Sequence, residues 1–307
     1  MTLFASSKSS INLPLDSFEG YQISIKREDL LHPIVSGNKF RKLKYNFLKF
    51  NKQKQIVVLT FGGAFSNHLA ATAFAGKESK VQTIGIVRGE EWKTKISQSS
   101  TLDFCQAQGM QLYFVSREAY RQKEASPLVQ TLIKKEHNLK ILPEGGTNAL
   151  AVKGCMEILT PEDQVFDTIC CCVGTGGTLA GLIESAAPTQ KLVGFSALNN
   201  PNLALEVKKY TSKTNWHIQD RYTFGGYAKY TLELIQFINA FYQQYQIPLD
   251  PIYTGKMLFG IFDLIKTNQW FWGKKILVIH SGGLQGIHPM NLQLQKKGLP
   301  QLLYSSD

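Results

Sequence analysis

The fold is decided by one stretch near the middle of the chain, Cys170-Cys171-Cys172-Val173-Gly174-Thr175-Gly176-Gly177-Thr178. Its first half ends an apolar run, from 167 to 173, that predicts a strand buried in a sheet. The glycines are followed by a predicted helix from 179 to 187. A strand, a glycine turn and a helix in this order are the repeating unit of parallel sheets, so the stretch predicts an α/β fold.

The alternation of strands and helices continues along the chain in two series. The first has predicted strands at 55–60, 81–87, 111–115 and 140–142, with helices at 69–76, 99–108 and 127–136. The second has helices at 149–159, 202–210, 232–245 and 256–267, with strands at 191–196, 216–220 and 275–279. Loops near 50–52 and 143–147 separate the series. We therefore expect a large domain formed by 1–50 and 145–307, with a small domain, 51–144, inserted into it.

Composition indicates a globular protein with small anionic ligands. The chain has 307 residues, of which 43% are hydrophobic and 19% charged, which is enough to build a sizeable core. Its formal net charge is +11, but the lysines are dispersed, and the sequence has no basic arm and no finger-like Cys/His spacing. Nucleic-acid binding is therefore a minor alternative. A positive surface favours anionic small molecules near a cleft.

Cysteine usage and the N-terminal residues predict a location in the cytoplasm. Five cysteines, three of them consecutive in an apolar strand, are typical of buried thiols in a reducing compartment. The first residues lack a basic segment followed by an apolar core, and no window approaches about 18 uninterrupted apolar residues. We expect neither an export signal nor a membrane span.

One lysine stands where a lysine can become reactive. In Ser36-Gly37-Asn38-Lys39, a turn leads into a one-sided helix, so Lys39 occupies the first helical turn. Both the helix dipole and partial burial lower the pKa of an amine there, which favours a neutral nucleophile. The alternative is an ordinary surface charge, since this short segment is rich in lysine and arginine.

The loop from 174 to 178 is a candidate phosphate site. Backbone N–H groups and the positive end of a helix dipole can hold a phosphate there, and Thr175 and Thr178 add hydroxyl donors. The loop is not a dinucleotide fingerprint, because Leu179 stands at the place of the third glycine, and it lacks the lysine of a Walker loop. The alternative is a tight turn that needs glycine for its backbone angles.

Other candidate residues lie on similar loops. Ser66, Asn67 and His68 open a helix and can contact a carboxylate or a ring oxygen, although N-capping explains the first two equally well. His68 has no second ligand at metal spacing, so we expect no metal site. Tyr253 and Tyr227 lie on constrained loops, and each alone is compatible with a half-buried structural residue. The serine in Ser281-Gly282-Gly283 can bond a heterocyclic nitrogen.

These loops are expected to meet in one cleft. Four glycine-bearing loops, at 62–63, 145–146, 174–178 and 281–283, follow predicted strands, and the carboxyl ends of parallel strands share one side of a sheet. An amine, a phosphate cradle, a polar Ser/Asn loop and a terminal hydroxyl are together what pyridoxal 5'-phosphate requires.

In order along nearly the whole chain, these motifs resemble those of the 1-aminocyclopropane-1-carboxylate deaminase/D-cysteine desulfhydrase family. The resemblance implies pyridoxal-phosphate dependence and the tryptophan synthase β-subunit-like fold of fold type II enzymes, with two open parallel-sheet, three-layer αβα domains. It also implies a homodimer. The motifs are Lys26-Arg27-Glu28-Asp29, Ser36-Gly37-Asn38-Lys39 with Arg41-Lys42-Leu43, Gly63 with Ser66-Asn67-His68, Pro143-Glu144-Gly145-Gly146, the loop from 174 to 178 and the segment from Asp250 to Lys256.

The resemblance also implies roles for individual residues. Lys39 would carry the cofactor, and Asn67 would contact its O3′. Lys42 would hold the phosphate together with Gly174, Thr175, Gly176, Gly177 and Thr178. Ser66, Asn67 and His68 would meet the substrate, Tyr253 and Tyr227 would be active-site tyrosines, and Thr254 and Ser281 would lie near the ring nitrogen. Phe65 departs from a glutamine that is common in the family at this place.

The expected activity is that of a D-cysteine desulfhydrase, a lyase that converts a small amino acid to pyruvate, ammonia and sulfide. Deaminases of the family carry a glutamate after the active-site tyrosine, where this chain has Thr254, and His68 also resembles the desulfhydrase version. The nearest alternative is 1-aminocyclopropane-1-carboxylate deaminase. An alternative of another class is a protein that binds pyridoxal phosphate without turnover.

Overall fold

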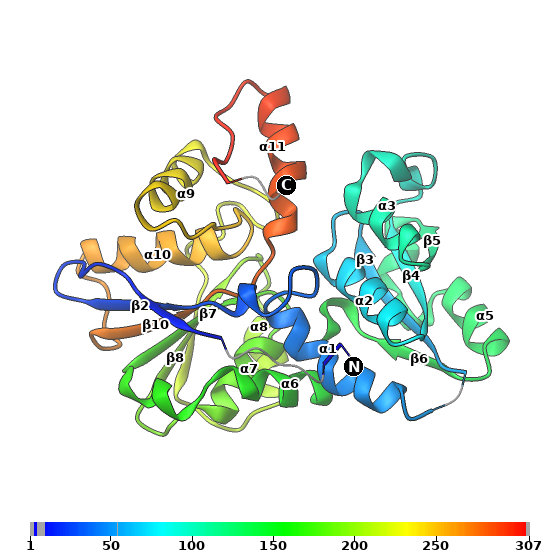
Figure 1. The fold of residues 1–307 in the computed structure, drawn as a ribbon, viewed down its shortest axis with the longest axis horizontal. Coiled ribbons are helices and arrows are strands. Elements are labelled where there is room, and N and C mark those ends of the chain that lie inside the picture. Colours follow the sequence, from blue (N-terminus) through cyan, green and yellow to red (C-terminus); the bar gives the residue numbers. More distant parts are fainter. Residues whose placement is uncertain (1–2, 5–9, 54, 305–307) are drawn as a thin grey trace.

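The computed structural model describes residues 3–4, 10–53 and 55–304 and contains two sheets that lie side by side (Figure 1). The larger sheet has the strand order β1-β2-β10-β7-β8-β9. Neighbouring strands in this sheet are parallel, except for the antiparallel pair of β1 and β2. Its strands are β1 (Asn12–Pro14), β2 (Gln22–Lys26), β10 (Lys275–Ile279), β7 (Thr168–Val173), β8 (Lys191–Ser196) and β9 (Trp216–Gln219).

The smaller sheet is parallel throughout and is formed by one continuous part of the chain. Its strand order is β5-β4-β3-β6. The strands are β3 (Val57–Gly63), β4 (Gln82–Arg88), β5 (Gln111–Val115) and β6 (Leu139–Leu142). The expected α/β class with two parallel sheets is confirmed.

Helices cover both faces of the larger sheet, which makes three layers. One face packs against α6 (Ala149–Cys155), α7 (Gly177–Ser185) and α8 (Leu203–Lys208), and the other against α9 (Leu232–Tyr245), α10 (Thr254–Lys266) and α11 (Ile287–Lys296). Because side chains alternate along a strand, Cys171 belongs to the first core and Cys170 and Cys172 to the second. All five cysteines are buried free thiols.

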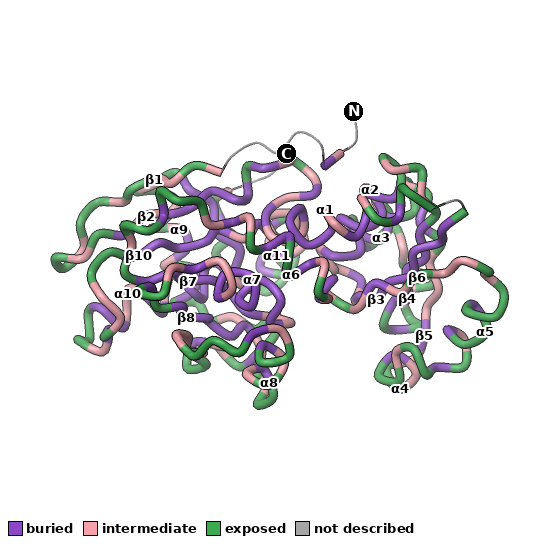
Figure 2. The backbone as a smooth tube through the Cα atoms, turned by 90° about the horizontal axis from the view of Figure 1, so that it is seen from below, coloured by how far each residue is buried: buried purple, intermediate pink, exposed green. Residues whose placement is uncertain are grey.

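The smaller sheet is also covered on both faces. On one side lie α1 (Asn38–Phe50), α2 (Asn67–Glu78) and α3 (Ser100–Ala107), and on the other α4 (Arg117–Arg121) and α5 (Pro127–Lys135). In Figure 2 the buried residues follow the strands of both sheets, and α4 and α5 expose their outer sides. No helix within the described residues is long and apolar enough to cross a membrane.

Helix α1 links the two sheets. Its apolar residues, among them Phe40, Leu43 and Phe47, share a core with Ile56 and Val58 of the small sheet. Its other side packs so closely on α6 that a Cβ at Gly154 would be 1.9 Å from the carbonyl oxygen of Arg41. The predicted boundary at residue 50 therefore separates α1 from the sheet that its apolar face covers. We propose that α1 belongs to both packing units.

Four elements have no counterpart in the sequence expectations: β1, β2, α4 and α11. The first three have three to five residues each, too few to show a clear periodicity. Helix α11 contains Pro289 near its start and follows a glycine-rich loop, a composition that is more typical of a turn. The expected helix at 149–159 is shorter, since α6 ends at Cys155 and a 3-10 turn follows.

Buried ion pairs connect the end of β2 to the rest of the fold. Lys26 contacts Asp163 at 2.8 Å, and Glu28 receives two hydrogen bonds of 2.7 Å from the guanidinium of Arg41 in α1. Paired and fully hydrogen-bonded charges are tolerated in a protein interior, whereas removing one partner leaves a costly buried charge. The pair between Glu28 and Arg41 thus holds α1 in position beside the large sheet.

A close backbone contact sets the start of α1. Gly37 has a φ of +58° and a ψ of −139°, a conformation that is essentially restricted to glycine. A Cβ at this position would lie 2.0 Å from the carbonyl oxygen of Ser281, after β10. The N–H of Asn38 donates to the same carbonyl at 3.2 Å. Glycine at position 37 therefore lets the N-terminus of α1 touch the end of the large sheet.

We predict that Gly37→Ala destabilises the protein strongly, because the added methyl group collides with backbone. The matched control is Gly20→Ala, at a φ of +77° with no atom within 4 Å of the added Cβ. The control should lose about 1–2 kcal/mol from its left-handed backbone alone, and Gly37→Ala more than about 4 kcal/mol. Urea unfolding of both variants measures the difference. Equal losses would show that the contact with Ser281 is not tight.

Candidate active site

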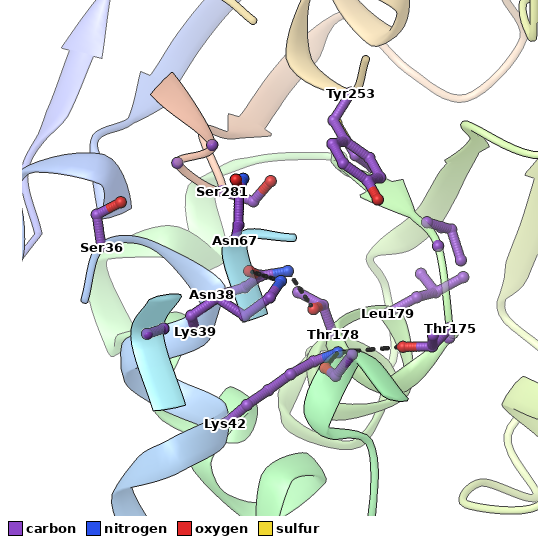
Figure 3. Close-up of a pocket in the computed structure, with 18 of the residues that line it drawn as sticks. Ser36, Asn38, Lys39, Lys42, Asn67, Thr175, Thr178, Leu179, Tyr253 and Ser281 are labelled. Atoms are coloured by element: carbon purple, nitrogen blue, oxygen red, sulfur yellow. Dashed lines mark hydrogen bonds between the residues drawn. The ribbon is translucent and has the colours of Figure 1, made fainter. Parts of the chain in front are cut away.

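A cavity lies where α1 and the loops after β3, β6, β7 and β10 meet (Figure 3). The expectation of one cleft at the carboxyl ends of the strands is thereby confirmed. The lining residues are Ile34, Ser36, Asn38, Lys39, Lys42, Asn67, Ala71, Gly145, Cys172, Val173, Gly174, Thr175, Gly176, Thr178, Leu179, Tyr253, Ser281, Gly282, Gly283 and Gln285. They include two lysines and no carboxylate.

Lys39 reaches the cavity from the first turn of α1. Its Nζ donates to Oδ1 of Asn38 at 2.9 Å, and Nδ2 of Asn38 donates to Oγ1 of Thr178 at 3.0 Å. Burial, with a further contribution from the neighbouring charge of Lys42, lowers the pKa of Lys39 from 10.5 to about 7. At neutral pH the amine is therefore in part a free base, as the sequence predicted for this position.

Lys42 lies one helical turn further on and points at the loop after β7. Its Nζ donates to Oγ1 of Thr147 at 3.0 Å, to the carbonyl oxygen of Gly145 at 3.2 Å and to Oγ1 of Thr175 at 3.4 Å. None of these partners is charged, so the ammonium has no counter-ion among the described residues. Burial lowers the pKa of Lys42. An anion bound beside Lys42 would offset the free-energy cost of burying an unpaired ammonium.

The loop from 174 to 178 brings bare backbone next to Lys42. Gly176, with a φ of +83°, ends the loop and precedes α7, a nine-residue helix whose N-terminus faces the cavity. A Cβ at Gly177 would lie 2.7 Å from the side chain of Thr147. Gly177 itself is not among the lining residues, whereas the other four residues of the loop are. Backbone donors, hydroxyls, a helix N-terminus and an unpaired cation suit a phosphate monoester.

The loop after β3 places Asn67 in the cavity and Ser66 beside it. Asn67 is the first residue of α2, and a Cβ at Gly283 would be 3.2 Å from its Nδ2. Ser66 is the N-cap of α2, and its Oγ accepts a hydrogen bond from the N–H of Leu69 at 3.3 Å. Ser66 does not line the cavity. The capping alternative for Ser66 is therefore realised.

His68 lies behind the cavity. The hydroxyl of Thr60 donates to the carbonyl of Leu142 and accepts from Nε2 of His68, at 2.8 and 2.7 Å. Nδ1 of His68 has no hydrogen-bond partner among the described residues. Burial, assisted by the charges of Lys39 and Lys42, lowers the pKa of His68 well below its usual value. The ring is thus a neutral support of the Ser66–Asn67 turn rather than part of the cavity wall.

Phe65 packs within the small domain. Its ring meets that of Trp92 edge to face, with the centroids 5.2 Å apart, and it joins the core between α2 and α3. It is not among the lining residues. The pocket's polarity therefore does not depend on this position.

Tyr253 is held by Asp250, and the same contacts occupy Thr254. Asp250 accepts hydrogen bonds of 2.9 Å from the backbone N–H groups of Ile252, Tyr253 and Thr254, and one of 2.8 Å from the Thr254 hydroxyl. Thr254 is fully buried and does not line the cavity, because its hydroxyl binds Asp250. Ser281 lines the cavity and remains the candidate for the contact with the ring nitrogen.

Tyr227 lies next to Tyr253 at the edge of the site. The ring centroids are 6.4 Å apart in an edge-to-face arrangement, and 44% of Tyr227 is exposed. Its loop is held by the buried Lys256, whose Nζ donates to the carbonyl oxygens of Thr223 and Gly226 at 2.7 and 2.8 Å. Burial lowers the pKa of Lys256 to about 8. Tyr227 is near the cavity but is not one of its lining residues.

Sequence reasoning missed several residues that shape the site. Asn38 positions Lys39, Thr147 holds Lys42, and Cys172 lines the cavity at the end of β7. Asn38 was recognisable as a polar neighbour of the lysine. No local sequence pattern indicates that Thr147 binds Lys42 or that the side chain of Cys172 lines the cavity. Among the residues described, no group of three His, Cys, Asp or Glu side chains is arranged to hold a metal.

Comparisons with known proteins agree with this site. The family model for pyridoxal-phosphate dependent enzymes matches residues 12–282. A putative 1-aminocyclopropane-1-carboxylate deaminase of Pyrococcus horikoshii is 31% identical, over 87% of this chain and 86% of its own length. A D-cysteine desulfhydrase of Klebsiella pneumoniae is 25% identical, over 88% of this chain and 90% of its own. The crystal structure of an ACC deaminase homologue superimposes with a TM-score of 0.78 and 27% identity, covering 94% of each chain.

The fold and these matches define a pyridoxal-phosphate dependent enzyme of fold type II. Within that class, the chain belongs to the 1-aminocyclopropane-1-carboxylate deaminase/D-cysteine desulfhydrase family, as the sequence resemblance predicted. The residues present fit the cofactor, because the cavity is lined by two lysines, by no carboxylate and by the glycine-rich loop at the N-terminus of α7.

We predict that Lys39→Met stabilises the cofactor-free protein at low pH. The pKa of Lys39 is about 7 in the folded state and 10.5 as the ordinary value, so the unfolded chain binds more protons between these limits. The lysine therefore penalises folding fully below pH 7, and the penalty fades as the pH rises toward 10. Urea unfolding from pH 6 to 9 should show the methionine variant's advantage shrinking with pH.

The matched control is Lys49→Met, an exposed lysine of the same helix. Its effect on stability should not change over this pH range. If Lys39→Met and Lys49→Met gave the same pH dependence, the amine of Lys39 would have an ordinary pKa.

Proposed function

We propose that the protein catalyses α,β-elimination on D-cysteine or a related β-substituted D-amino acid, giving pyruvate, ammonia and the released β group. The observation that carries the proposal is the uncharged cavity wall around Ser281, where no carboxylate faces the position expected for the ring nitrogen. A neutral partner makes the ring a weaker electron sink. Such a site suits substrates whose leaving group departs readily, as a thiolate does.

Five polar residues of the cavity have a part in this proposal. Bound pyridoxal phosphate supplies an electron sink that acidifies the Cα–H of an attached amino acid. Lys42, Thr175 and Thr178 hold the phosphate with the N-terminus of α7, and Asn67 contacts the ring's O3′. Lys39 accepts the Cα proton, because a pKa of about 7 leaves part of the amine unprotonated at neutral pH.

The substrate is held between the two sheets. The N-terminus of α2, with Ser66 and Asn67, is suited to the substrate's carboxylate, since helix N-termini attract anions. Tyr253 faces the cavity from the opposite domain. Burial raises its pKa well above the usual value, so its hydroxyl stays protonated and can donate to the departing group. Tyr227 supports this ring from the cavity's edge.

A second candidate is deamination of 1-aminocyclopropane-1-carboxylate. It is favoured by the names of the relatives that are about 30% identical to this chain. The buried Thr254, which binds Asp250 rather than facing the cavity, argues against it. A non-catalytic pyridoxal-phosphate binder is an alternative of another class, and the lowered pKa of Lys39 argues against that.

We predict that borohydride treatment of the cofactor-loaded protein fixes the cofactor covalently to Lys39, and that Lys39→Ala abolishes turnover. Peptide mapping by mass spectrometry identifies the labelled lysine. Lys256→Ala removes another buried amine near the site, one that does not line the cavity, and should leave the label on Lys39. Label on any lysine other than Lys39 would contradict the assignment.

We predict that D-cysteine gives pyruvate with a higher kcat/KM than 1-aminocyclopropane-1-carboxylate gives 2-oxobutyrate. The ratio of the two values measures relative stabilisation of the two transition states on one preparation. Ser281→Ala should lower both kcat/KM values, because both reactions use the cofactor ring whose nitrogen Ser281 is expected to contact. A clear preference for the cyclopropane substrate would replace the proposal with its alternative.

A further inference from the structure

Arg88 lies at the rim of the site, at the carboxyl end of β4. It pairs in register with Gly63 at the end of β3. A Cβ at Gly63 would have one neighbour within 4 Å, Nη2 of Arg88 at 3.5 Å. The carbonyl of Gly63 in turn accepts the N–H of Ser66 at 3.0 Å. The guanidinium therefore lies over the turn that leads into the Ser66–Asn67 loop.

The charge of Arg88 is not compensated by its neighbours. The carboxylate of Glu144 is held by Nζ of Lys123 at 2.7 Å and by the hydroxyl of Tyr120 at 2.6 Å. The side chain of Arg88 has no hydrogen bond or ion pair in the part of the chain that the structure describes, and its Cζ lies 5.7 Å from the centroid of the Tyr120 ring. Its donors are free for a ligand.

Arg88 faces the opposite domain across the mouth of the cavity. The Arg88 guanidinium lies over the ring of Tyr120, whose hydroxyl donates to Glu144 at 2.6 Å, and Gly145 next to it lines the cavity. Burial raises the pKa of Tyr227, and the charge of Arg88 opposes this rise. Tyr227 packs on Tyr253, which lines the cavity. An amino acid in the cavity with its carboxylate at the N-terminus of α2 would have its β substituent near this rim.

We propose that Arg88 is a specificity-determining residue that binds an anionic group on Cβ of the substrate. The inference rests on the proposed elimination and narrows its substrate class. A guanidinium offers a planar fork of donors that matches sulfate, phosphate or carboxylate oxygens. The natural substrates are then β-substituted amino acids with a negative charge on the leaving group.

For a sulfate ester the reaction balances without an oxidant. Lys39 takes the Cα proton, the Cβ–O bond breaks with its electron pair going to sulfate, and one water hydrolyses the remaining enamine. The products are pyruvate, ammonia and sulfate. Arg88 stabilises the leaving sulfate and releases it to solvent, because the side chain is exposed.

The experiment compares two substrates that differ in charge at Cβ, D-serine O-sulfate and 3-chloro-D-alanine. Both yield pyruvate on elimination. Arg88→Gln should lower kcat/KM for the sulfate ester about 10- to 100-fold, the range of one charge-assisted hydrogen bond. The same variant should change kcat/KM for 3-chloro-D-alanine by less than about 3-fold. Arg88→Lys should recover part of the kcat/KM lost on the sulfate ester. Equal losses on both substrates would overturn the proposal.

The matched control is Arg117→Gln, which removes the same charge from the same domain. Arg117 is 75% exposed and forms a surface pair with Glu91 at 3.4 Å. Its removal should leave the ratio of the two kcat/KM values unchanged. A ratio that fell as much as in Arg88→Gln would mean that only general surface charge is at work.

A binding measurement separates this proposal from the proposed function. If neither substrate gives pyruvate, elimination is wrong, and absorbance titration of the cofactor-loaded protein with D-serine O-sulfate and D-alanine still tests Arg88. D-serine O-sulfate should bind more weakly to Arg88→Gln than to the parent protein, whereas D-alanine should bind equally to both. Unchanged affinity for the sulfate would overturn the role of Arg88.

Discussion

The position of the reactive lysine depends on a backbone contact between two segments that are far apart in the sequence. Gly37 lies against the carbonyl of Ser281, and the N–H of Asn38 donates to the same oxygen. This contact joins the start of α1 to the end of β10. Lys39 thereby reaches the strand ends of the large sheet, while the apolar face of α1 lies on the small sheet. The loop from 174 to 178, Lys39 and the Ser66–Asn67 loop meet because one helix touches both sheets.

The charges around the cavity are arranged so that its cations stay unpaired. Carboxylates lie close by, but each is bound elsewhere: Glu28 by Arg41, Asp250 by the start of α10 and Glu144 by Lys123. Burial and the charge of Lys42 lower the pKa of Lys39, and the charge of Asp250 offsets this only in part. The same arrangement that leaves this amine reactive also makes the cavity attractive for an anionic cofactor.

The first turn of α10 organises both tyrosines of the site. Asp250 accepts the backbone N–H groups that precede and begin the helix and so directs Tyr253 into the cavity. Lys256, buried one turn later, donates to two carbonyls of the loop that carries Tyr227. Burying a lysine whose hydrogen-bond partners are carbonyls alone costs free energy. Lys256 therefore fits a loop whose position serves substrate binding.

Local features of the sequence determined the parallel strands, the glycine turns between them and the candidates Lys39, Lys42 and 174–178, because periodicity and glycine content are properties of neighbouring residues. Short β1 and β2 left no such pattern. Only the tertiary structure decided which side chains remain available for a ligand. Thr254 binds Asp250 and His68 binds Thr60, whereas the guanidinium of Arg88 keeps its donors free. A side chain's hydrogen-bonding capacity is used by whichever partner the fold brings near, and that partner can come from any part of the chain.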